Sequence, residues 1–153
     1  MRPGFALGPE STADVERLVG HLDGLPLAIE LAAARVRLLD PVEILQRQKM
    51  GALIGLERST RLGEIARSGT LIEAEPSGEL ISNIFFNKAP LHDGAMIIRE
   101  GKIHAAGCIL PLTDNLQISR ELGTRHRAGV GMSENSVCVV VILSEETGAI
   151  SLA

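Results

Sequence analysis

The hydrophobic positions in about the first 46 residues follow the spacing of helices rather than that of strands. A first helix is predicted to end near Val19. Pro26 lies near the first turn of a second helix, where a missing N–H costs little. That second helix is rich in Ala, Leu and Glu, which favour helix formation. Asp40 and Pro41 are expected to end it and to cap a third helix over residues 42–49.

After residue 50 the pattern changes to short apolar runs that are separated by turns and by stretches of helical spacing. The run GALIGLE and the β-branched run VCVVVIL are predicted to be buried strands. Glu100 and Gly101 lie between two further apolar runs, which is typical of a tight β-hairpin. The predicted elements are a strand at 51–57, a helix within 76–86, hairpin strands at 95–99 and 102–110, a helical stretch at 118–133 interrupted by Gly123, a strand at 137–143 and a last strand at 149–153.

Strands that alternate with helices, together with one antiparallel hairpin, predict an α/β fold with a mixed β-sheet flanked by helices. The chain has 153 residues, of which 45% are apolar, so it can bury a core of ordinary size. The helical first part is then an N-terminal extension of the sheet domain.

Composition argues against several classes of function. The net charge is −4 and the only aromatic residues are three phenylalanines, which argues against both a broad nucleic-acid surface and a base-stacking platform.

Cys108 and Cys138 lie in apolar runs without a histidine at zinc spacing, so two reduced core thiols in a cytoplasmic protein are predicted. The longest uncharged apolar run, residues 137–143, is too short to cross a bilayer, and neither a membrane segment nor a signal peptide is predicted.

Four polar stretches lie at the ends of predicted apolar elements. Each alone has an ordinary structural interpretation. Asp-Gly is a common turn pair, Arg-His-Arg is usually a solvated face, Ser-Glu-Glu-Thr-Gly is usually a turn, and a His beside an Asp is often a local hydrogen-bonded pair. The stretches are His92-Asp93-Gly94, Leu110-Pro111-Leu112, Gly123 to Arg127, and Ser144 to Gly148.

Taken together, the four stretches fit a site for a nucleotide and a metal ion. Carboxylates are the hard oxygen ligands that Mg²⁺ or Mn²⁺ prefers, arginine binds phosphate with a fork of donors, and backbone N–H groups at a helix start bind anions. The sequence contains neither a P-loop motif nor G-x-G-x-x-G, which argues against two common nucleotide folds. The groups concerned are the carboxylates of Asp93, Glu145 and Glu146, the guanidinium groups of Arg125 and Arg127, and the backbone of Gly94, Gly123 and Thr124.

Four longer segments over about residues 50–153 resemble the diadenylate cyclase (DAC) domain, most closely its membrane-linked CdaA type. They are GALIGLERSTRLGEIARSGT, SGELISNIFFNKAPLHDGAMIIREGKIHAAGCILPLTDN, SRELGTRHRAGVGMSE and VVVILSEETGAISLA. The Asp-Gly-Ala and Arg-His-Arg signatures occur in the family order, with Leu-Pro-Leu between them and Ser-Glu-Glu-Thr-Gly after them. Four matching segments over a whole domain are a more specific signal than any one of them.

The resemblance implies an enzyme that condenses two ATP molecules into cyclic di-AMP and releases two pyrophosphates. It also implies a divalent cation, Mg²⁺ or Mn²⁺, and a homodimer in which two active sites face each other. The implied catalytic residues are Asp93, Gly94, Arg125, His126 and Arg127. The implied ATP-binding residues are Gly94, Ala95, Leu110, Thr124, Arg125, Ser144 and Glu145, with the backbone of Leu110 at the adenine. The implied metal ligands are Asp93, Glu145 and His92.

Residues 1–46 resemble a different family, as a helical fragment of the STAND-type signal-transduction ATPase regulators without their ATP-binding loop. The expected organisation is a helical extension over 1–46, which is not a complete domain, and a diadenylate cyclase catalytic domain over 47–153. Two other interpretations stay open. In one, the extension prevents productive dimerisation and leaves a catalytically silent nucleotide-binding or regulatory protein. In the other, the extension is a helical module that recruits a partner.

Overall fold

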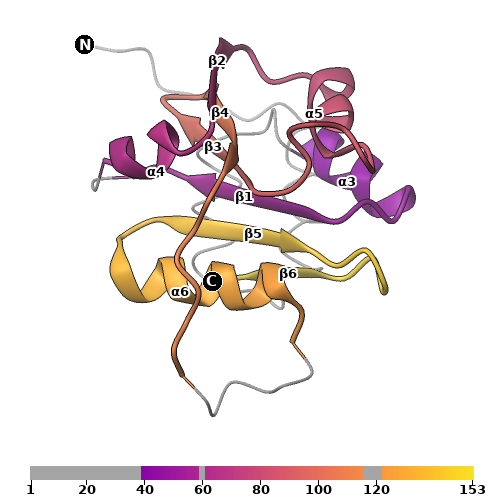
Figure 1. The fold of residues 1–153 in the computed structure, drawn as a ribbon. Coiled ribbons are helices and arrows are strands. Elements are labelled where there is room, and N and C mark those ends of the chain that lie inside the picture. Colours follow the sequence, from indigo (N-terminus) through magenta and orange to yellow (C-terminus); the bar gives the residue numbers. More distant parts are fainter. Residues whose placement is uncertain (1–38, 59–60, 116–121) are drawn as a thin grey trace, which may run out of the picture.

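The apolar runs of the sequence become the central strands of a six-stranded β-sheet (Figure 1). The computed structural model describes residues 39–58, 61–115 and 122–153, so the two helices predicted ahead of residue 39 lie outside the described residues. None of the described helices is long and apolar enough to cross a bilayer. In chain order the elements are α3 (Leu39–Arg47), β1 (Ala52–Leu56), α4 (Gly63–Arg67), β2 (Thr70–Ala74), α5 (Gly78–Phe85), β3 (Ala95–Arg99), β4 (Lys102–Cys108), α6 (Thr124–Asn135), β5 (Val139–Leu143) and β6 (Ile150–Leu152).

The strands follow the order β2-β4-β3-β1-β5-β6 across the sheet. β1 pairs with β3 in parallel, with Ile54 beside Met96, whereas the four other strand pairs are antiparallel. The predicted mixed sheet is therefore confirmed. Its one parallel pair lies at the centre, where parallel strands are usually found because both of their faces need cover.

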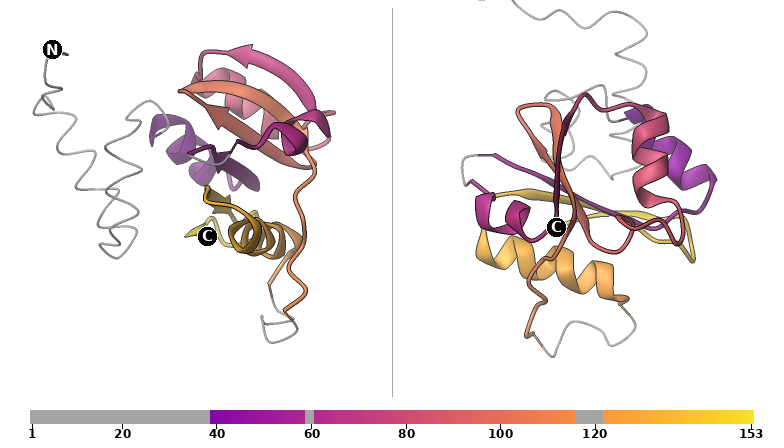
Figure 2. Two further views of the ribbon diagram at one scale, coloured as in Figure 1. Left: turned by 90° about the vertical axis from the view of Figure 1, so that its left-hand side faces the viewer. Right: turned by 45° about the horizontal axis from the view of Figure 1, so that its top comes forward.

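Helices cover both faces of the sheet, which explains why its central strands are continuous apolar runs. Successive residues of a strand point to opposite faces, so neighbouring residues of β1 belong to different hydrophobic clusters. Ile54 packs in the cluster that contains side chains of α3 and α5, and Leu53 in the cluster that contains side chains of α4 and α6. Figures 1 and 2 show the resulting layers, with α3 and α5 on one face and α6 on the other.

Helix α3 is part of this core, because Leu45 is fully buried and Val42 nearly so. It begins at Leu39, three residues before the predicted start, so Asp40 and Pro41 lie within its first turn instead of ahead of it. Proline is tolerated there because the first N–H groups of a helix have no intrahelical acceptor. The predicted domain boundary at residue 47 therefore falls at the end of a helix that packs on the sheet.

The other elements predicted after residue 50 are confirmed, whereas α4 and β2 were not predicted. Helix α4 is only five residues long, and β2 is an edge strand with mostly exposed residues and a bulge between Leu71 and Ala74. Neither gives a clear hydrophobic period. Helix α6 begins at Thr124 with Gly123 as its N-cap, which agrees with the predicted break at Gly123. The part of the predicted helical stretch at 118–121 lies outside the described residues.

The β3–β4 hairpin has the tight turn that the sequence predicts. Arg99 pairs with Lys102, which leaves a two-residue connection. Glu100 has a φ of 48° and Gly101 a φ of 85°, and two positive φ angles are what the hairpin turn of type I′ requires. The turn fixes the register at this end of the hairpin, and the pairing shifts twice between Ile98 and Ala95 before the end where β3 begins and β4 finishes.

Both cysteines are free and buried, as predicted. Burial raises the pKa of the Cys108 thiol to about 11, an effect that a hydrogen bond from the backbone of Gly69 partly offsets. Burial also raises the pKa of Cys138. The two thiols therefore stay protonated at neutral pH and act as small apolar side chains.

A bidentate ion pair closes the end of the sheet where β1 and β3 finish. The Nε and Nη2 atoms of Arg99 donate to the two carboxylate oxygens of Glu57, each at 2.8 Å. The backbone N–H of Leu62 donates to the same carboxylate at 2.8 Å, and only 7% of the Glu57 side chain is exposed. Burial raises the pKa of Glu57, but the hydrogen bonds from Arg99 and Leu62 and the nearby positive charges together outweigh it. The pKa of this carboxyl therefore lies below its ordinary value.

Replacing Glu57 by Gln is expected to lower the free energy of unfolding at pH 7 by about 2 kcal/mol, because it leaves Arg99 without its counter-ion. The lowered pKa of Glu57 means that the pair stabilises the fold above the ordinary carboxyl pKa and stops doing so as the pH falls through the lowered value. Denaturant titrations at several pH values should therefore show the free energies of unfolding of the unchanged protein and of Glu57→Gln converging in acid.

The exposed pair between Arg47 and Glu43 provides the control, since its Nη2–Oε2 distance is 3.3 Å and 78% of the Arg47 side chain is exposed. Arg47→Gln should cost less than about 0.5 kcal/mol. Equal losses for Glu57→Gln and Arg47→Gln would show that the buried pair contributes nothing special.

Candidate functional site

Strand pairing brings four chain segments to one edge of the sheet. β1 and β3 are parallel and start at this edge, whereas β4 and β5 run the other way and end at it. In Figure 1, β1 starts, β5 ends and α6 starts toward the right of the view. The segments ahead of β1 and β3 and after β4 and β5 therefore meet here. They carry Gly51, Asp93-Gly94, Leu110 and Ser144-Glu145.

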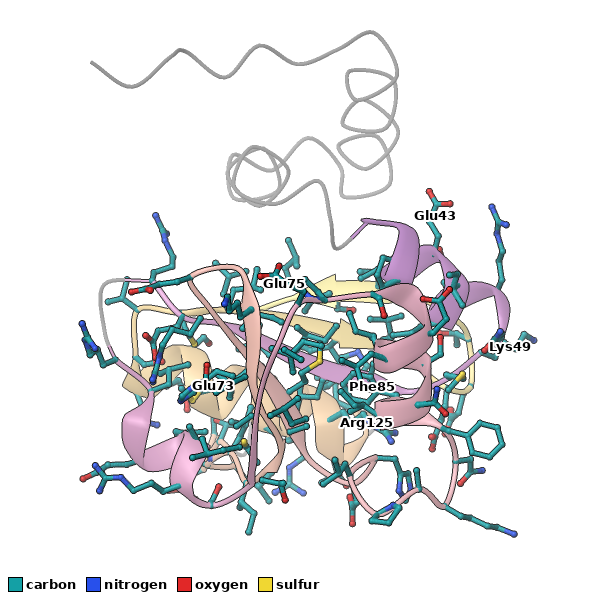
Figure 3. The ribbon with its side chains drawn as sticks, turned by 90° about the horizontal axis from the view of Figure 1, so that it is seen from above. Glu43, Lys49, Glu73, Glu75, Phe85 and Arg125 are labelled. Carbon is teal, nitrogen blue, oxygen red and sulfur yellow. The ribbon has the colours of Figure 1, made fainter. Side chains whose placement is uncertain are left out.

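The first turn of α6 reaches the same edge through Arg125. The Nη1 atom of Arg125 donates to the Oε2 atom of Glu145 at 2.9 Å, which joins the helix to the turn after β5. A Cβ atom added to Gly51 would lie 2.5 Å from this Nη1 atom and 2.9 Å from this Oε2 atom. Gly51 thus leaves the space in which the ion pair sits. Figure 3 shows Arg125 toward the side of the molecule where Lys49 leads into β1, and Glu73 of β2 toward the opposite side.

Residues 144–148 form the predicted turn and hold Glu145 near its tip. The Ser144 N–H donates to the Ala149 carbonyl and the Gly148 N–H donates to the Ser144 carbonyl, both at 2.9 Å. The Thr147 N–H donates to the Ser144 hydroxyl at 3.3 Å. The turn is closed at its base, so the exposed carboxylate of Glu145 is presented by a fixed backbone.

Gly94 has a packing role that the sequence did not indicate. Its φ is +136°, and an added Cβ atom would lie 2.7 Å from the Gly107 carbonyl carbon and 2.9 Å from the Cys108 oxygen. The start of β3 therefore approaches the end of β4 closely enough to require glycine. Ala95, the next residue, is fully buried in the core.

His92 and Asp93 lie just ahead of this contact. The Nδ1 atom of His92 donates to the Ala89 carbonyl at 2.6 Å, because a carbonyl can only accept, and this bond leaves the Nε2 atom for another partner. The Asp93 carboxylate is exposed and has no hydrogen-bond partner among the described residues. In the described part of the chain no three His, Cys, Asp or Glu side chains are grouped as a metal site, so His92, Asp93 and Glu145 do not form one by themselves.

The other first-turn residues of α6 have different surroundings. Gly123 offers no side chain to cap the helix and the first turn holds no acidic residue, so its N–H groups face no capping side chain. Thr124 and Arg127 are exposed. The Nε2 atom of His126 lies 3.4 Å from the Ser151 hydroxyl of β6. The structure thus places Arg125 against Glu145, and His126 against β6.

The segment after β4 has a mixed apolar surface. Leu110 is buried, whereas Ile109 is 72% and Leu112 46% exposed. The Ile109 N–H donates to the Ser68 hydroxyl at 2.9 Å, which ties this segment to the end of α4. An apolar surface therefore lies at one end of the site, and the charged pair of Arg125 and Glu145 at the edge where β5 ends.

Comparison with known proteins finds one family model over this fold. The model described as "DAC: DisA bacterial checkpoint controller nucleotide-binding" matches residues 40–153. The chain is 46% identical over 112 residues to cyclic di-AMP synthase CdaA of Bacillus subtilis, a match that covers 73% of this chain and 41% of that protein. It is 43% identical over 124 residues to cyclic di-AMP synthase CdaS of the same organism, covering 81% of this chain and 59% of that one.

A solved structure has the same architecture. The crystal structure of a double mutant of DacA from Staphylococcus aureus superposes with a TM-score of 0.72 at 46% sequence identity, covering 74% of this chain and 76% of that chain. The chain thus spans between two fifths and three fifths of the length of the two curated relatives, and about three quarters of the solved chain.

Replacing Gly51 by Ala tests whether the ion pair belongs to an anion site. The three atoms nearest to the new Cβ atom belong to the flexible ends of the Arg125 and Glu145 side chains, so the fold should keep its stability while the pair is displaced. We expect the affinity for inorganic tripolyphosphate, measured by calorimetry, to fall about tenfold, which is the effect of losing one charge-assisted hydrogen bond.

Gly63→Ala is the matched control, because a Cβ atom there would meet nothing within 4 Å. It should bind tripolyphosphate as the unchanged protein does. Unchanged binding by Gly51→Ala would contradict the assignment of Arg125 to an anion site.

Proposed function

The chain belongs to the DAC family, and from this premise we propose that it is a diadenylate cyclase that converts two ATP molecules into cyclic di-AMP and two pyrophosphates. In this reaction the 3′-oxygen of each nucleotide loses its proton and forms a bond to the α-phosphorus of the other nucleotide. The bond from each α-phosphorus to the oxygen that bridges to the β-phosphate breaks, and pyrophosphate leaves. The observation that carries the proposal is the single sheet edge at which Asp93, Arg125 and Glu145 are presented. Relatives named cyclic di-AMP synthase match the chain over this region.

The pair of Arg125 and Glu145 is suited to exchange partners when ATP binds. The Arg125 side chain is 27% exposed and that of Glu145 62% exposed, so the pair contributes at most about 1 kcal/mol to stability. A phosphate of ATP can then bind the Arg125 guanidinium group in place of Glu145, and the Glu145 carboxylate becomes available to a cation. The uncapped N–H groups of α6 provide further donors for phosphate oxygens.

Mg²⁺ or Mn²⁺ fits the donors that the edge presents. The free carboxylate of Asp93 would bind the ion together with ATP phosphates, and the carboxylate of Glu145 and the Nε2 atom of His92 are the further ligands proposed. Because these three side chains are not grouped among the described residues, the ion and the phosphates would have to draw them together. When bound, such a cation lowers the pKa of a hydroxyl and offsets the charge that builds on phosphate oxygens. The chain itself keeps Asp93 and Gly94 fixed through the close backbone contact with β4.

The rest of the proposed site follows the family assignment. The Leu110 backbone lies at the adenine, Gly94 and Ala95 offer backbone beside the nucleotide, and Thr124, Ser144 and Glu145 lie on its phosphate side. Arg127 and His126 are assigned to the site because they lie in the first turn of α6. His126 would act either after moving away from Ser151 or through the Ser151 hydroxyl. These roles rest on matching residues and on their place at the edge.

The reaction calls for two copies of the chain. The sheet edge of one chain presents one set of ligand-binding groups, which serves one ATP. Each ATP must offer its 3′-hydroxyl to the α-phosphate of another ATP. We therefore propose a homodimer with facing sites, acting in the cytoplasm where ATP is supplied. Residues 40–153 are proposed as the catalytic unit, in place of the predicted start at residue 47, because the family match and the core both include α3.

Asp93→Asn tests the cation assignment. Incubated with ATP and Mn²⁺, the unchanged protein should form cyclic di-AMP, detected by chromatography, and the variant should lose more than about a hundredfold of this rate because the neutral amide is a poor ligand. Its thermal unfolding should be unchanged, since the carboxylate is exposed and has no partner among the described residues.

Glu64→Gln, which neutralises an exposed carboxylate on α4, should keep full activity. Full activity of a folded Asp93→Asn protein would overturn the cation assignment. Nucleotide binding without any product from the unchanged protein would instead indicate the catalytically silent alternative.

A further inference from the structure

Thr113 links the segment after β4 to helix α6. Its backbone N–H donates to the Arg127 carbonyl at 3.1 Å, and its hydroxyl donates to the Oε1 atom of Glu134 at 2.9 Å. The same hydroxyl accepts from the Asn115 N–H at 3.1 Å. Thr113 is only 4% exposed, so a polar side chain is buried here with its hydrogen-bonding capacity used.

Glycine allows the segment to lie directly on the helix. A Cβ atom added to Gly131 would lie 2.4 Å from the Pro111 oxygen and 2.5 Å from the Thr113 nitrogen, both of which are backbone atoms. The views agree that the segment after β4 runs across α6 (Figures 1 and 2). The Gly131 contact sets how close the two can come, and the bonds of Thr113 set their register.

The two parts that are joined in this way carry different chemistry. The segment carries the backbone of Leu110, whose side chain is buried, and the exposed apolar side chain of Leu112, which suits the flat apolar face of a nucleobase. The first turn of α6 presents uncapped N–H groups and Arg125, which suit phosphates. A nucleotide has both parts at a fixed separation, so the register between segment and helix decides whether one molecule can use both.

We propose that Thr113 and Glu134 are positioning residues that hold the base-contacting segment in register with the phosphate-binding turn of α6. This inference rests on the proposed function, because it takes ATP as the ligand. A positioning role for Thr113 and Glu134 makes a different prediction for ligand binding than a contact that only stabilises the fold. Loss of the register should weaken a ligand that has base and phosphates together, and should leave a ligand that has phosphates alone unaffected.

The experiment compares two probes on the full chain. 3′-Deoxyadenosine triphosphate has the base but no attacking hydroxyl, so it binds without reacting, and inorganic tripolyphosphate has no base. Thr113→Val removes the hydroxyl while keeping the shape of the side chain, and Glu134→Ala removes its acceptor. Both variants should bind the deoxynucleotide about tenfold more weakly and tripolyphosphate within about twofold of the unchanged protein.

Conservative variants separate positioning from packing. Thr113→Ser and Glu134→Gln keep a hydroxyl donor and an oxygen acceptor, so they should restore most of the deoxynucleotide affinity. Ser133→Ala is the control on the same helix, because within the described part of the chain the Ser133 hydroxyl bonds to the Val130 carbonyl one turn earlier. If Thr113→Val does not fold, as judged by circular dichroism, the exposed position of Glu134 lets Glu134→Ala carry the test.

Equal losses for both probes, or no loss for either, would overturn the positioning role while leaving the proposed function intact. Failure of the unchanged protein to bind the deoxynucleotide would overturn the proposed function, and this inference with it. The two failures are therefore distinguishable in one set of titrations.

Discussion

The parallel pairing of β1 with β3 is the constraint on which the candidate site depends. All other strand pairs are antiparallel, so this one pair makes two strands start where β4 and β5 end. Without it, the loop that carries Asp93 would lie at the opposite edge from Gly51 and the turn of Glu145. The pairing is made possible by helical cover on both faces, since central parallel strands need apolar contacts on each side.

The residues that stabilise the fold and the residues of the candidate site lie at opposite ends of β1. Glu57 follows the strand and forms a largely buried, bidentate pair with Arg99, which fixes the end that carries no candidate site. Gly51 precedes the strand and faces the exposed pair of Arg125 and Glu145. An exposed pair is weak and can be exchanged for a ligand, whereas a buried pair resists exchange because an unpaired buried charge is costly.

Local patterns were enough to predict the strongly apolar elements, and long-range contacts explain what was missed. β1, the hairpin and β5 are apolar runs whose burial on two faces overrides other signals. β2 lies at the sheet edge with a bulge, and its sequence carries no clean alternation. The chemistry of the polar stretches indicated a site for a nucleotide and a metal ion, and the family resemblance added the role of each residue. Gly51 and Thr113 gave no signal, because the groups that explain them are Arg125 and Glu134, far along the chain.

In the proposed site, one edge of the sheet binds a single ATP between the start of β3 and the first turn of α6. A crystal structure of the chain with 3′-deoxyadenosine triphosphate and Mn²⁺ would show where the nucleotide lies. We expect the phosphates at Arg125 and the α6 turn, the cation at Asp93, and the base beside Leu110. A nucleotide bound elsewhere, with the pair of Arg125 and Glu145 intact, would contradict this expectation.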